Sequence, residues 1–252
     1  MGIRLDDARI IVTGAATGIG RASALRLLEA GARVALWDCN TSAVAETIEA
    51  AGARKASAFA IEADVSNADS VAAAFTRTLE QLGGLDGAFN NAGIGAPTTP
   101  LETIEESDYD AVLNVNLKGV WLCMREQIRH FKTNGGGVIV NNASVAGLVA
   151  LAMQGAYGAA KHGVIGLTKV AAVEGATFGV RVNAICPGAV QTSLLSHLEQ
   201  AGIDQAVLAS MSPQNRIAMP SEIAETVLWL LSDASSFITG AAVPVDGGWS
   251  AQ

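Results

Sequence analysis

The fold is decided by the stretch Ile10-Ile11-Val12-Thr13-Gly14-Ala15-Ala16-Thr17-Gly18-Ile19-Gly20. Its first four residues form an apolar run, which predicts a buried strand over residues 10–13. The glycines that follow let the backbone turn sharply and approach a pyrophosphate without Cβ clashes. A helix predicted from residue 19 would then offer unpaired N–H groups to the phosphates. Glycine-rich turns of this kind also occur in proteins that bind no ligand. In this chain the glycine spacing is Gly-x3-Gly-x-Gly and not the commoner GxGxxG.

Apolar runs alternate with helix-length amphipathic segments along the chain, which is typical of an α/β fold with a doubly wound parallel sheet. Several runs are continuously apolar, as expected where helices cover both faces of a sheet. We predict one Rossmann-type domain over residues 1–252, with about seven parallel strands and a substrate flap around 188–220. Strands are predicted at 10–13, 34–38, 56–61, 87–90, 138–141, 181–185 and 242–245, and helices near 19–30, 41–51, 67–82, 103–131, 156–178 and 221–232.

Composition narrows the classes of function. The chain has 252 residues, half of them apolar, and a formal net charge of −8. An acidic surface would repel a phosphate backbone or an anionic membrane, so we expect neither nucleic-acid nor membrane binding. No apolar run approaches the ~18–20 residues that cross a bilayer. The N-terminus does not resemble a signal peptide, and a cytoplasmic location is expected.

Cysteines and histidines do not form a recognisable ligand set. The cysteines lack CxxC spacing and the histidines lack metal-ligand spacing, so we predict neither a disulfide framework nor a metal site. These residues are Cys39, Cys123, Cys186, His130, His162 and His197.

Asp38 ends the second predicted strand, 18 positions past Gly20. Dinucleotide-binding folds place an acid at this point, on the ribose hydroxyls of adenosine. A carboxylate there would repel the extra 2′-phosphate of NADP, and its neighbours Trp37 and Cys39 supply no basic group. The sequence therefore predicts NAD as cofactor, unless Asp38 only begins the turn before the next helix.

Tyr157 and Lys161 lie four residues apart in a helical pattern, hence on one face. A free phenol has a pKa near 10, and a nearby ammonium favours its phenolate form. A tyrosine so tuned can take a proton from an alcohol as hydride leaves, or return it to a ketone. Such pairs are common on helix surfaces, but the small residues around Tyr157 would let a cofactor approach closely.

Ser144 lies 13 residues before Tyr157, just after an apolar strand. Side chains at the carboxyl ends of strands line the ligand crevice of open α/β sheets. Ser144 could therefore hydrogen-bond a substrate oxygen; the alternative is an ordinary turn serine.

Together these residues resemble the short-chain dehydrogenase/reductase (SDR) family, in its compact, single-domain, NAD-dependent branch. The resemblance covers essentially the whole chain. One departure is Ala143, where a second serine is common. Further matches are Asp64-Val65, the pair that contacts adenine; Asn90-Asn91-Ala92-Gly93, of which the last three line the cofactor; Asn116, the active-site asparagine; Pro187-Gly188 with Val190 and Thr192, the loop that holds the nicotinamide carboxamide; and Asp246-Gly247-Gly248.

The resemblance implies that NAD(H) exchanges hydride with a secondary alcohol or ketone. In that mechanism Tyr157 is the general acid/base, and Lys161 holds the nicotinamide ribose and lowers the pKa of the tyrosine. Ser144 polarises the carbonyl oxygen, while Asn116 holds a water that links Lys161 to solvent. Gly14, Thr17, Gly18, Ile19 and Gly20 form the cofactor turn.

The segments expected around the substrate are 94–100, 145–154 and 190–215. They are mainly apolar, which favours a hydrophobic or cyclic secondary alcohol, although their leucines could equally pack the core.

Two further expectations concern assembly. The resemblance implies a homotetramer that pairs the helices near 103–131 and 156–178, where Val112, Val115, Trp121 and Leu122 could face a partner or the sheet. The last residue, Gln252, resembles one that some alcohol dehydrogenases of the family use at an intersubunit magnesium site.

Three alternatives remain. An NADPH-linked 3-oxoacyl-carrier-protein reductase is disfavoured by Asp38 and by the negative net charge. A non-catalytic NAD-binding sensor would have no physical need for the complete set of Asn116, Ser144, Tyr157 and Lys161. A sugar-nucleotide epimerase would need an extra substrate domain, for which 252 residues leave little room.

Overall fold

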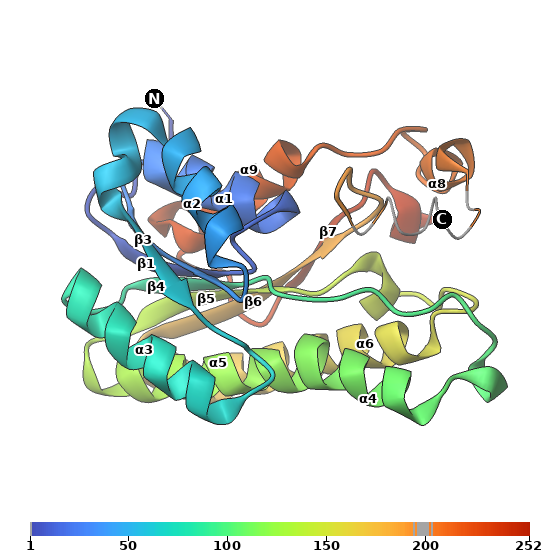
Figure 1. Cartoon of the computed structure of the whole chain (residues 1–252), viewed down its shortest axis with the longest axis horizontal. Helices are drawn as coiled ribbons and strands as arrows, with labels where there is room; N and C mark the ends of the chain where they lie inside the picture. The colour runs from blue at the N-terminus through green and yellow to red at the C-terminus, as the bar shows by residue number, and fades with distance from the viewer. Residues whose placement is uncertain (1, 194, 196–201, 203) are drawn as a thin grey trace.

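Seven parallel strands form one continuous sheet in the order β3-β2-β1-β4-β5-β6-β7 (Figure 1). The structure is a computed structural model that describes residues 2–193, 195, 202 and 204–252. The strands are β1 (Arg9–Thr13), β2 (Arg33–Asp38), β3 (Ala58–Glu62), β4 (Gly87–Asn90), β5 (Gly137–Asn142), β6 (Val180–Pro187) and β7 (Ala242–Val245). This arrangement confirms the predicted doubly wound fold. The strand order reverses between β1 and β4, and open sheets of this type bind ligands at that switch point.

Helices cover both faces of the sheet (Figure 1). One layer contains α1 (Gly18–Glu29), α2 (Thr41–Ala50) and α9 (Pro220–Leu231); the other contains α3 (Ala68–Leu82), α4 (Glu106–Leu113), α5 (Gly119–Thr133) and α6 (Gly155–Gly175). Among the described residues, no helix is both long and apolar enough to span a bilayer.

The side chains of β1, an inner strand of the sheet, explain why the predicted strands are continuously apolar. Ile10 and Val12 are buried in the cluster formed with α1 and α9, whereas Ile11 is buried in the cluster formed with α3, α5 and α6. Side chains of a strand alternate between its faces, so a strand covered twice must be apolar at every position.

The long helix predicted over 103–131 is interrupted. Residues Leu101–Thr103 form a 3₁₀ turn, and a π-helical segment, Asn114–Lys118, separates α4 from α5. A π turn holds one more residue than an α turn and is frequent at functional sites. Here it contains Asn116, whose side chain is fully buried.

The small residues beside Tyr157 serve helix packing. Ala156 and Ala160 form a buried cluster with Val112 of α4. A Cβ on Gly155 would lie 2.6 Å from the Cδ1 atom of Leu101. These three residues therefore serve helix packing, and the close approach of a cofactor to the small residues around Tyr157 stays a prediction.

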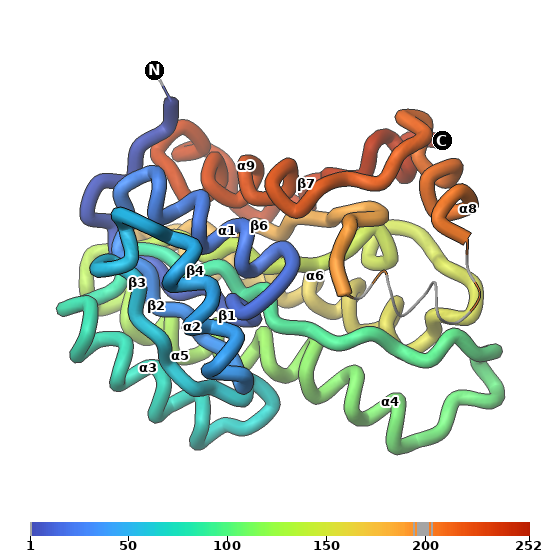
Figure 2. Tube along the Cα trace, turned by 45° about the horizontal axis from the view of Figure 1, so that its top comes forward, coloured from blue at the N-terminus to red at the C-terminus, as the bar shows by residue number. Residues whose placement is uncertain are grey.

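The described part of the predicted flap over 188–220 includes the short helix α8 (Gln205–Ser210), and residues after this helix contact the C-terminus. Ser212 donates through its hydroxyl to the carbonyl of Gly247 at 3.0 Å, and the Gln252 amide donates to the carbonyl of Met211 at 3.0 Å. Figure 2 shows this segment running above the loop between β4 and α4. Residues 194, 196–201 and 203, His197 among them, lie outside the described residues.

A network of buried amide groups joins β4 and β5 to the helices beneath them. The Asn90 amide donates to Gln127 of α5 at 3.0 Å and to Asn141 of β5 at 2.9 Å, and Gln127 donates back to Asn90 at 2.8 Å. Asn141 in turn donates to the hydroxyl of Thr168 on α6 at 2.9 Å. All four side chains are buried. Buried polar groups are stabilising only when they are satisfied, so this network fixes the ends of the two strands.

Replacing Gln127 by leucine should destabilise the fold. The change leaves Asn90 without its partner amide, and a buried polar group without a partner costs roughly 1–3 kcal/mol. We expect Gln127→Leu to lower the free energy of unfolding, measured by urea denaturation, by roughly 2–4 kcal/mol for the two lost bonds. Arg129→Ala, two residues along the same helix at an exposed position, should change it by less than about 0.5 kcal/mol. Equal effects would contradict a structural role for the network.

Candidate active site

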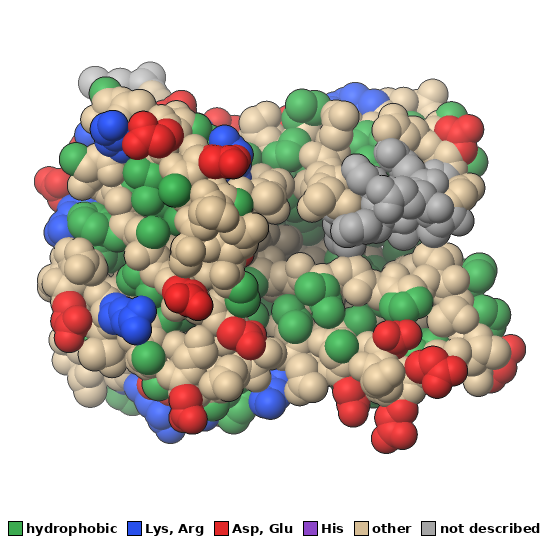
Figure 3. Space-filling view, in the orientation of Figure 1, with side chains coloured by type: hydrophobic (Ala, Val, Ile, Leu, Met, Phe, Trp, Pro, Cys, Tyr) green, Lys and Arg blue, Asp and Glu red, His purple; other side chains and the backbone are tan. Residues whose placement is uncertain are grey.

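A cleft of about 380 Å³ opens at the carboxyl ends of the strands, at the switch point. In the space-filling view, the surface is hollowed near the middle of this face (Figure 3). Its lining includes thirteen of the residues predicted to bind cofactor or to act in catalysis: Gly14, Thr17, Gly18, Ile19, Asp38, Asp64, Val65, Asn91, Ala92, Gly93, Tyr157, Lys161 and Thr192.

Six other predicted site residues do not line this cleft. Gly20 is buried in the first turn of α1, where a Cβ would lie 2.0 Å from the carbonyl oxygen of Gly14. Val190 is buried in the core and bridges to Ala218. Pro187 is the last residue of β6, and Gly188, which follows it, packs against the backbone of Asp246. The remaining two, Asn116 and Ser144, are described below.

The glycine turn has the backbone that its sequence requires. Gly14 and Gly18 have φ angles of 64° and 54°, a region that favours glycine. A Cβ on Gly14 would lie 2.9 Å from the Cα of Ala92, and one on Gly18 would lie 3.1 Å from Cγ2 of Thr192. Thr17 precedes α1 without capping it through its side chain, so N–H groups of the first turn face the cleft unpaired. This cradle fits the pyrophosphate of a dinucleotide.

Asn91 braces the turn from the neighbouring strand. Its amide donates to the carbonyl oxygens of Thr13 at 3.0 Å and Gly14 at 3.2 Å. The hydroxyl of Thr13 accepts from the backbone N–H groups of Asn91 and Ala92, both at 2.9 Å. The turn is thereby fixed to the end of β4.

Asp38 lies at the other side of the same turn. Its carboxylate accepts from the N–H of Ala16 at 3.0 Å and from that of Asn40 at 3.0 Å. Beside it, the Cys39 thiol donates to the carbonyl of Ala63 at 3.2 Å. Burial and the nearby carboxylates of Asp64, Asp38 and Glu62 raise the pKa of this thiol. Asp38 therefore serves the loop structure as well as facing the cleft.

Lys161 is almost fully buried, and its ammonium donates to the carbonyl oxygen of Asn142 at 2.7 Å. It lies 5.5 Å from the centre of the Tyr157 ring. Burial lowers the pKa of Lys161 to about 8, an effect that the charge of Cys186 opposes.

The pKa of Tyr157 is shifted opposite to the expectation. Burial raises it, and the hydroxyl of Ser144, as a hydrogen-bond partner, opposes this effect. The lowering effect expected from Lys161 is not seen here: burial dominates, and the lysine donates to the Asn142 carbonyl. Ser144 also accepts from the N–H of Ala146 at 3.1 Å, which orients its side chain next to the phenol.

Both ends of the Asn116 carboxamide are hydrogen-bonded to the backbone of Ile94. Its carboxamide oxygen accepts from the N–H of Ile94 at 2.8 Å, and its amide donates to the carbonyl of Ile94 at 2.8 Å. The side chain therefore fixes Ile94, a half-exposed apolar residue that lines the cleft. The water that Asn116 is expected to hold stays a prediction.

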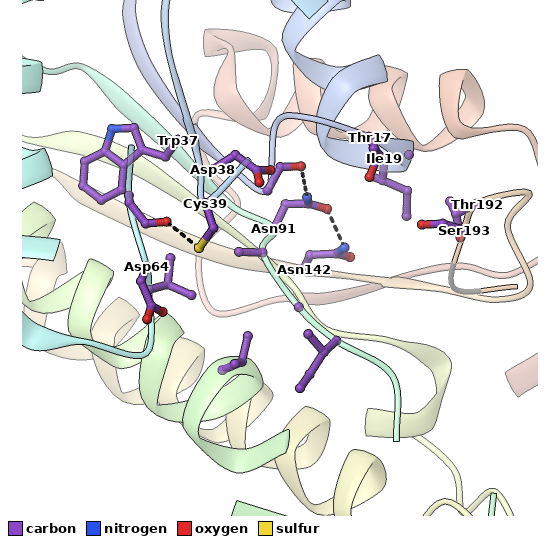
Figure 4. A pocket seen from close by; sticks show the side chains of 18 of the residues that line it. Thr17, Ile19, Trp37, Asp38, Cys39, Asp64, Asn91, Asn142, Thr192 and Ser193 are labelled. Atoms are coloured by element: carbon purple, nitrogen blue, oxygen red, sulfur yellow. Dashed lines mark hydrogen bonds between the residues drawn. The ribbon is translucent and has the colours of Figure 1, made fainter. Parts of the chain in front are cut away.

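Asn142 is a cleft residue that the sequence reasoning missed. Its amide donates to the carboxamide oxygen of Asn91 at 2.9 Å, and Figure 4 shows the two side chains lying next to each other. A signal was available, because Asn141-Asn142 at the end of β5 repeats the pattern Asn90-Asn91 at the end of β4. The other lining residues outside the predicted set are Trp37, Cys39, Ala63, Ile94, Val115 and Ser193.

Comparisons with known proteins agree with this geometry. A family model described as enoyl-(acyl carrier protein) reductase matches residues 14–250. The 2,5-dichloro-2,5-cyclohexadiene-1,4-diol dehydrogenase of Sphingobium indicum is 43% identical over 250 residues, covering 98% of each chain. The cis-4-hydroxycyclohexanecarboxylate dehydrogenase of Sinomonas cyclohexanicum is 42% identical over 253 residues, covering 100% of each. The crystal structure of levodione reductase superposes with a TM-score of 0.94 at 37% identity, covering 98% of this chain and 99% of that one.

The similarity thus extends over nearly the whole chain, in sequence as well as in fold. Proteins of this group use a nicotinamide cofactor, which the glycine turn fits. The chain is an oxidoreductase and belongs to the short-chain dehydrogenase/reductase family.

Proposed function

We propose that this protein uses NAD(H) to interconvert an uncharged, hydrophobic or cyclic secondary alcohol and its ketone. The observation that carries the proposal is the position of Tyr157, which shares one cleft with the glycine turn and has Ser144 and Lys161 as neighbours. A proton donor and a dinucleotide cradle in one cleft are what hydride exchange with a carbonyl requires.

The cofactor, when bound, supplies the acceptor or donor of hydride. The protein supplies the proton and the positions. Because burial raises the pKa of Tyr157, its phenol is protonated at neutral pH and can give a proton to a ketone oxygen. Ser144 would hold that oxygen, and Lys161 would hold the ribose next to the nicotinamide. The residues proposed to hold the rest of the cofactor are Gly14, Thr17, Gly18, Ile19, Gly20, Asp38, Asp64, Val65, Asn91, Ala92, Gly93, Pro187, Gly188, Val190 and Thr192.

The preference for NAD rests on Asp38. Its carboxylate borders the end of the cleft that contains Asp64, so a 2′-phosphate would meet negative charge there. Among the lining residues that the structure describes, the one cation is Lys161, which lies beside Tyr157.

The substrate class rests on the lining and on the relatives. Ile94 presents an apolar side chain to the cleft, and its backbone is fixed by Asn116. Two relatives are named for six-membered carbocycles that carry hydroxyl groups. An uncharged ring alcohol needs no cation for recognition, and the one cation of the described lining, Lys161, already donates to the Asn142 carbonyl.

We also propose a homotetramer. Val112 and Leu122 are buried within the chain, but Trp121 on α5 and Val170 and Val173 on α6 are exposed apolar residues. Exposed apolar groups on neighbouring helices favour an interface between copies. The magnesium role of Gln252 stays a prediction.

Removing the phenol hydroxyl tests the proton donor. Tyr157→Phe keeps the ring and its packing, so we expect NADH to bind with nearly unchanged affinity in a fluorescence titration. Turnover should fall at least about 100-fold, the lower range of general acid–base contributions. Tyr109→Phe alters the only other tyrosine of the chain, on α4, and should retain full activity. Normal turnover by Tyr157→Phe would refute the role.

Neutralising Asp38 tests the choice of cofactor. Asp38→Asn removes the charge but keeps one acceptor oxygen for the loop, unlike alanine. The ratio of kcat/KM for NADP to that for NAD should rise by at least about tenfold, which corresponds to ~1.4 kcal/mol. Glu62→Gln removes a charge from the residue paired with Asp38 across the sheet and should shift this ratio less than about twofold. An unchanged ratio in Asp38→Asn would rule out the assignment.

A substrate panel tests the reaction itself. NAD reduction would be followed with cyclohexanol, cyclohexane-1,4-diol, cis-4-hydroxycyclohexanecarboxylate and sorbitol. We expect the two uncharged ring alcohols to exceed the carboxylate in kcat/KM by about tenfold, because a carboxylate would be desolvated without a cationic partner. Turnover of sorbitol or the carboxylate alone would overturn the proposed substrate class.

A further inference from the structure

Asn142 has three hydrogen-bonding groups at the cleft, and two of them are engaged. Its carbonyl oxygen accepts from the ammonium of Lys161, and its amide N–H donates to Asn91. The third group, the side-chain oxygen Oδ1, is screened from solvent and has no hydrogen-bond partner among the described residues.

An acceptor in this state needs a donor. Buried polar atoms are nearly always paired, because an unpaired one forfeits its hydration without compensation. Of the described side chains, the hydroxyl of Ser23 shares this condition, but it lies within α1 and does not line the cleft. Asn142 does line the cleft, and a rotation of its whole carboxamide, opposed by the single hydrogen bond to Asn91, would present the oxygen to a ligand there.

The chemistry of the oxygen restricts its partner. An amide oxygen only accepts hydrogen bonds, and phosphate diesters carry no donor, which excludes the pyrophosphate. The adenine end of the cofactor would lie by Asp64, away from Asn142 in the cleft (Figure 4). The remaining donors are the ribose hydroxyls on the nicotinamide side and the carboxamide N–H₂. The Asn142 carbonyl also holds Lys161, so the hydroxyls of that ribose are the nearer choice.

We propose that Oδ1 of Asn142 binds a hydroxyl of the ribose on the nicotinamide side of the cofactor, an inference that rests on the proposed function. Asn142 is then a further cofactor-binding residue. It also joins Lys161 to Asn91, and through Asn91 to the glycine turn.

The test is a set of dissociation constants measured by calorimetry for NADH, ADP-ribose and ADP. ADP-ribose carries the second ribose without nicotinamide, and ADP carries neither. The readout is the ratio of the Kd for ADP to that for ADP-ribose, because an effect on the glycine turn alters both values and cancels. Asn142→Leu should reduce this ratio roughly threefold to tenfold, as loss of one hydrogen bond predicts.

Two further variants make the result specific. Asn142→Asp loses the donor to Asn91 but keeps an acceptor oxygen, so its ratio should stay within about twofold of the wild type. Thr168→Val removes a buried hydrogen bond of the network below the sheet and should leave the ratio unchanged.

An unchanged ratio in Asn142→Leu would overturn the assignment. So would a loss confined to NADH, since that would identify the carboxamide as the donor. If the wild type binds none of the three nucleotides, the proposed function itself fails. Binding of all three with an unchanged ratio refutes only the role of Asn142.

Discussion

The alternation of side chains at the ends of β4 and β5 is the constraint on which the site depends. Asn90 and Asn141 are paired across the two strands and point toward α5 and α6, where Gln127 and Thr168 satisfy them. The next residue of each strand must then point the other way. Asn91 and Asn142 therefore meet on the opposite side and hydrogen-bond to each other. One buried network thus determines where the second pair of amides lies.

This second pair connects the two halves of the cleft. Asn91 holds the carbonyl of Gly14, and Asn142 holds the ammonium of Lys161. A displacement of either strand end would move the phosphate cradle and the lysine together. Backbone and amide groups at the strand ends fix the position of the phosphate cradle relative to Lys161, and strands are more rigid than loops. Such rigidity suits hydride exchange, whose rate depends on the alignment of reacting atoms.

Much of this could be predicted from the sequence, because the signals were local. The glycine turn, Asp38 and the Tyr157–Lys161 spacing are each recognised from residues close together in the sequence. The continuous apolar runs indicate strands that helices cover on both faces. What escaped prediction depends on contacts between distant segments. The π-helical segment around Asn116, the pairing of Asn142 with Asn91 and the packing of Ala156 on Val112 all require the tertiary structure. The direction of the Tyr157 pKa shift was missed for the same reason, since burial cannot be read from helix spacing.

Asp38 illustrates how recognition and stability are coupled in this fold. A residue chosen only to repel a 2′-phosphate could be any acid that faces the adenosine end of the cleft. Here the carboxylate also accepts from Ala16 within the glycine turn and from Asn40, which caps α2. A smaller residue at this position would lose both bonds and loosen the pyrophosphate cradle, even with a cofactor whose phosphate it no longer repels. Cofactor preference in this protein is therefore tied to the shape of the turn, because the two N–H groups bond to different oxygens of the carboxylate and a neutral amide at this position keeps only one of these oxygens.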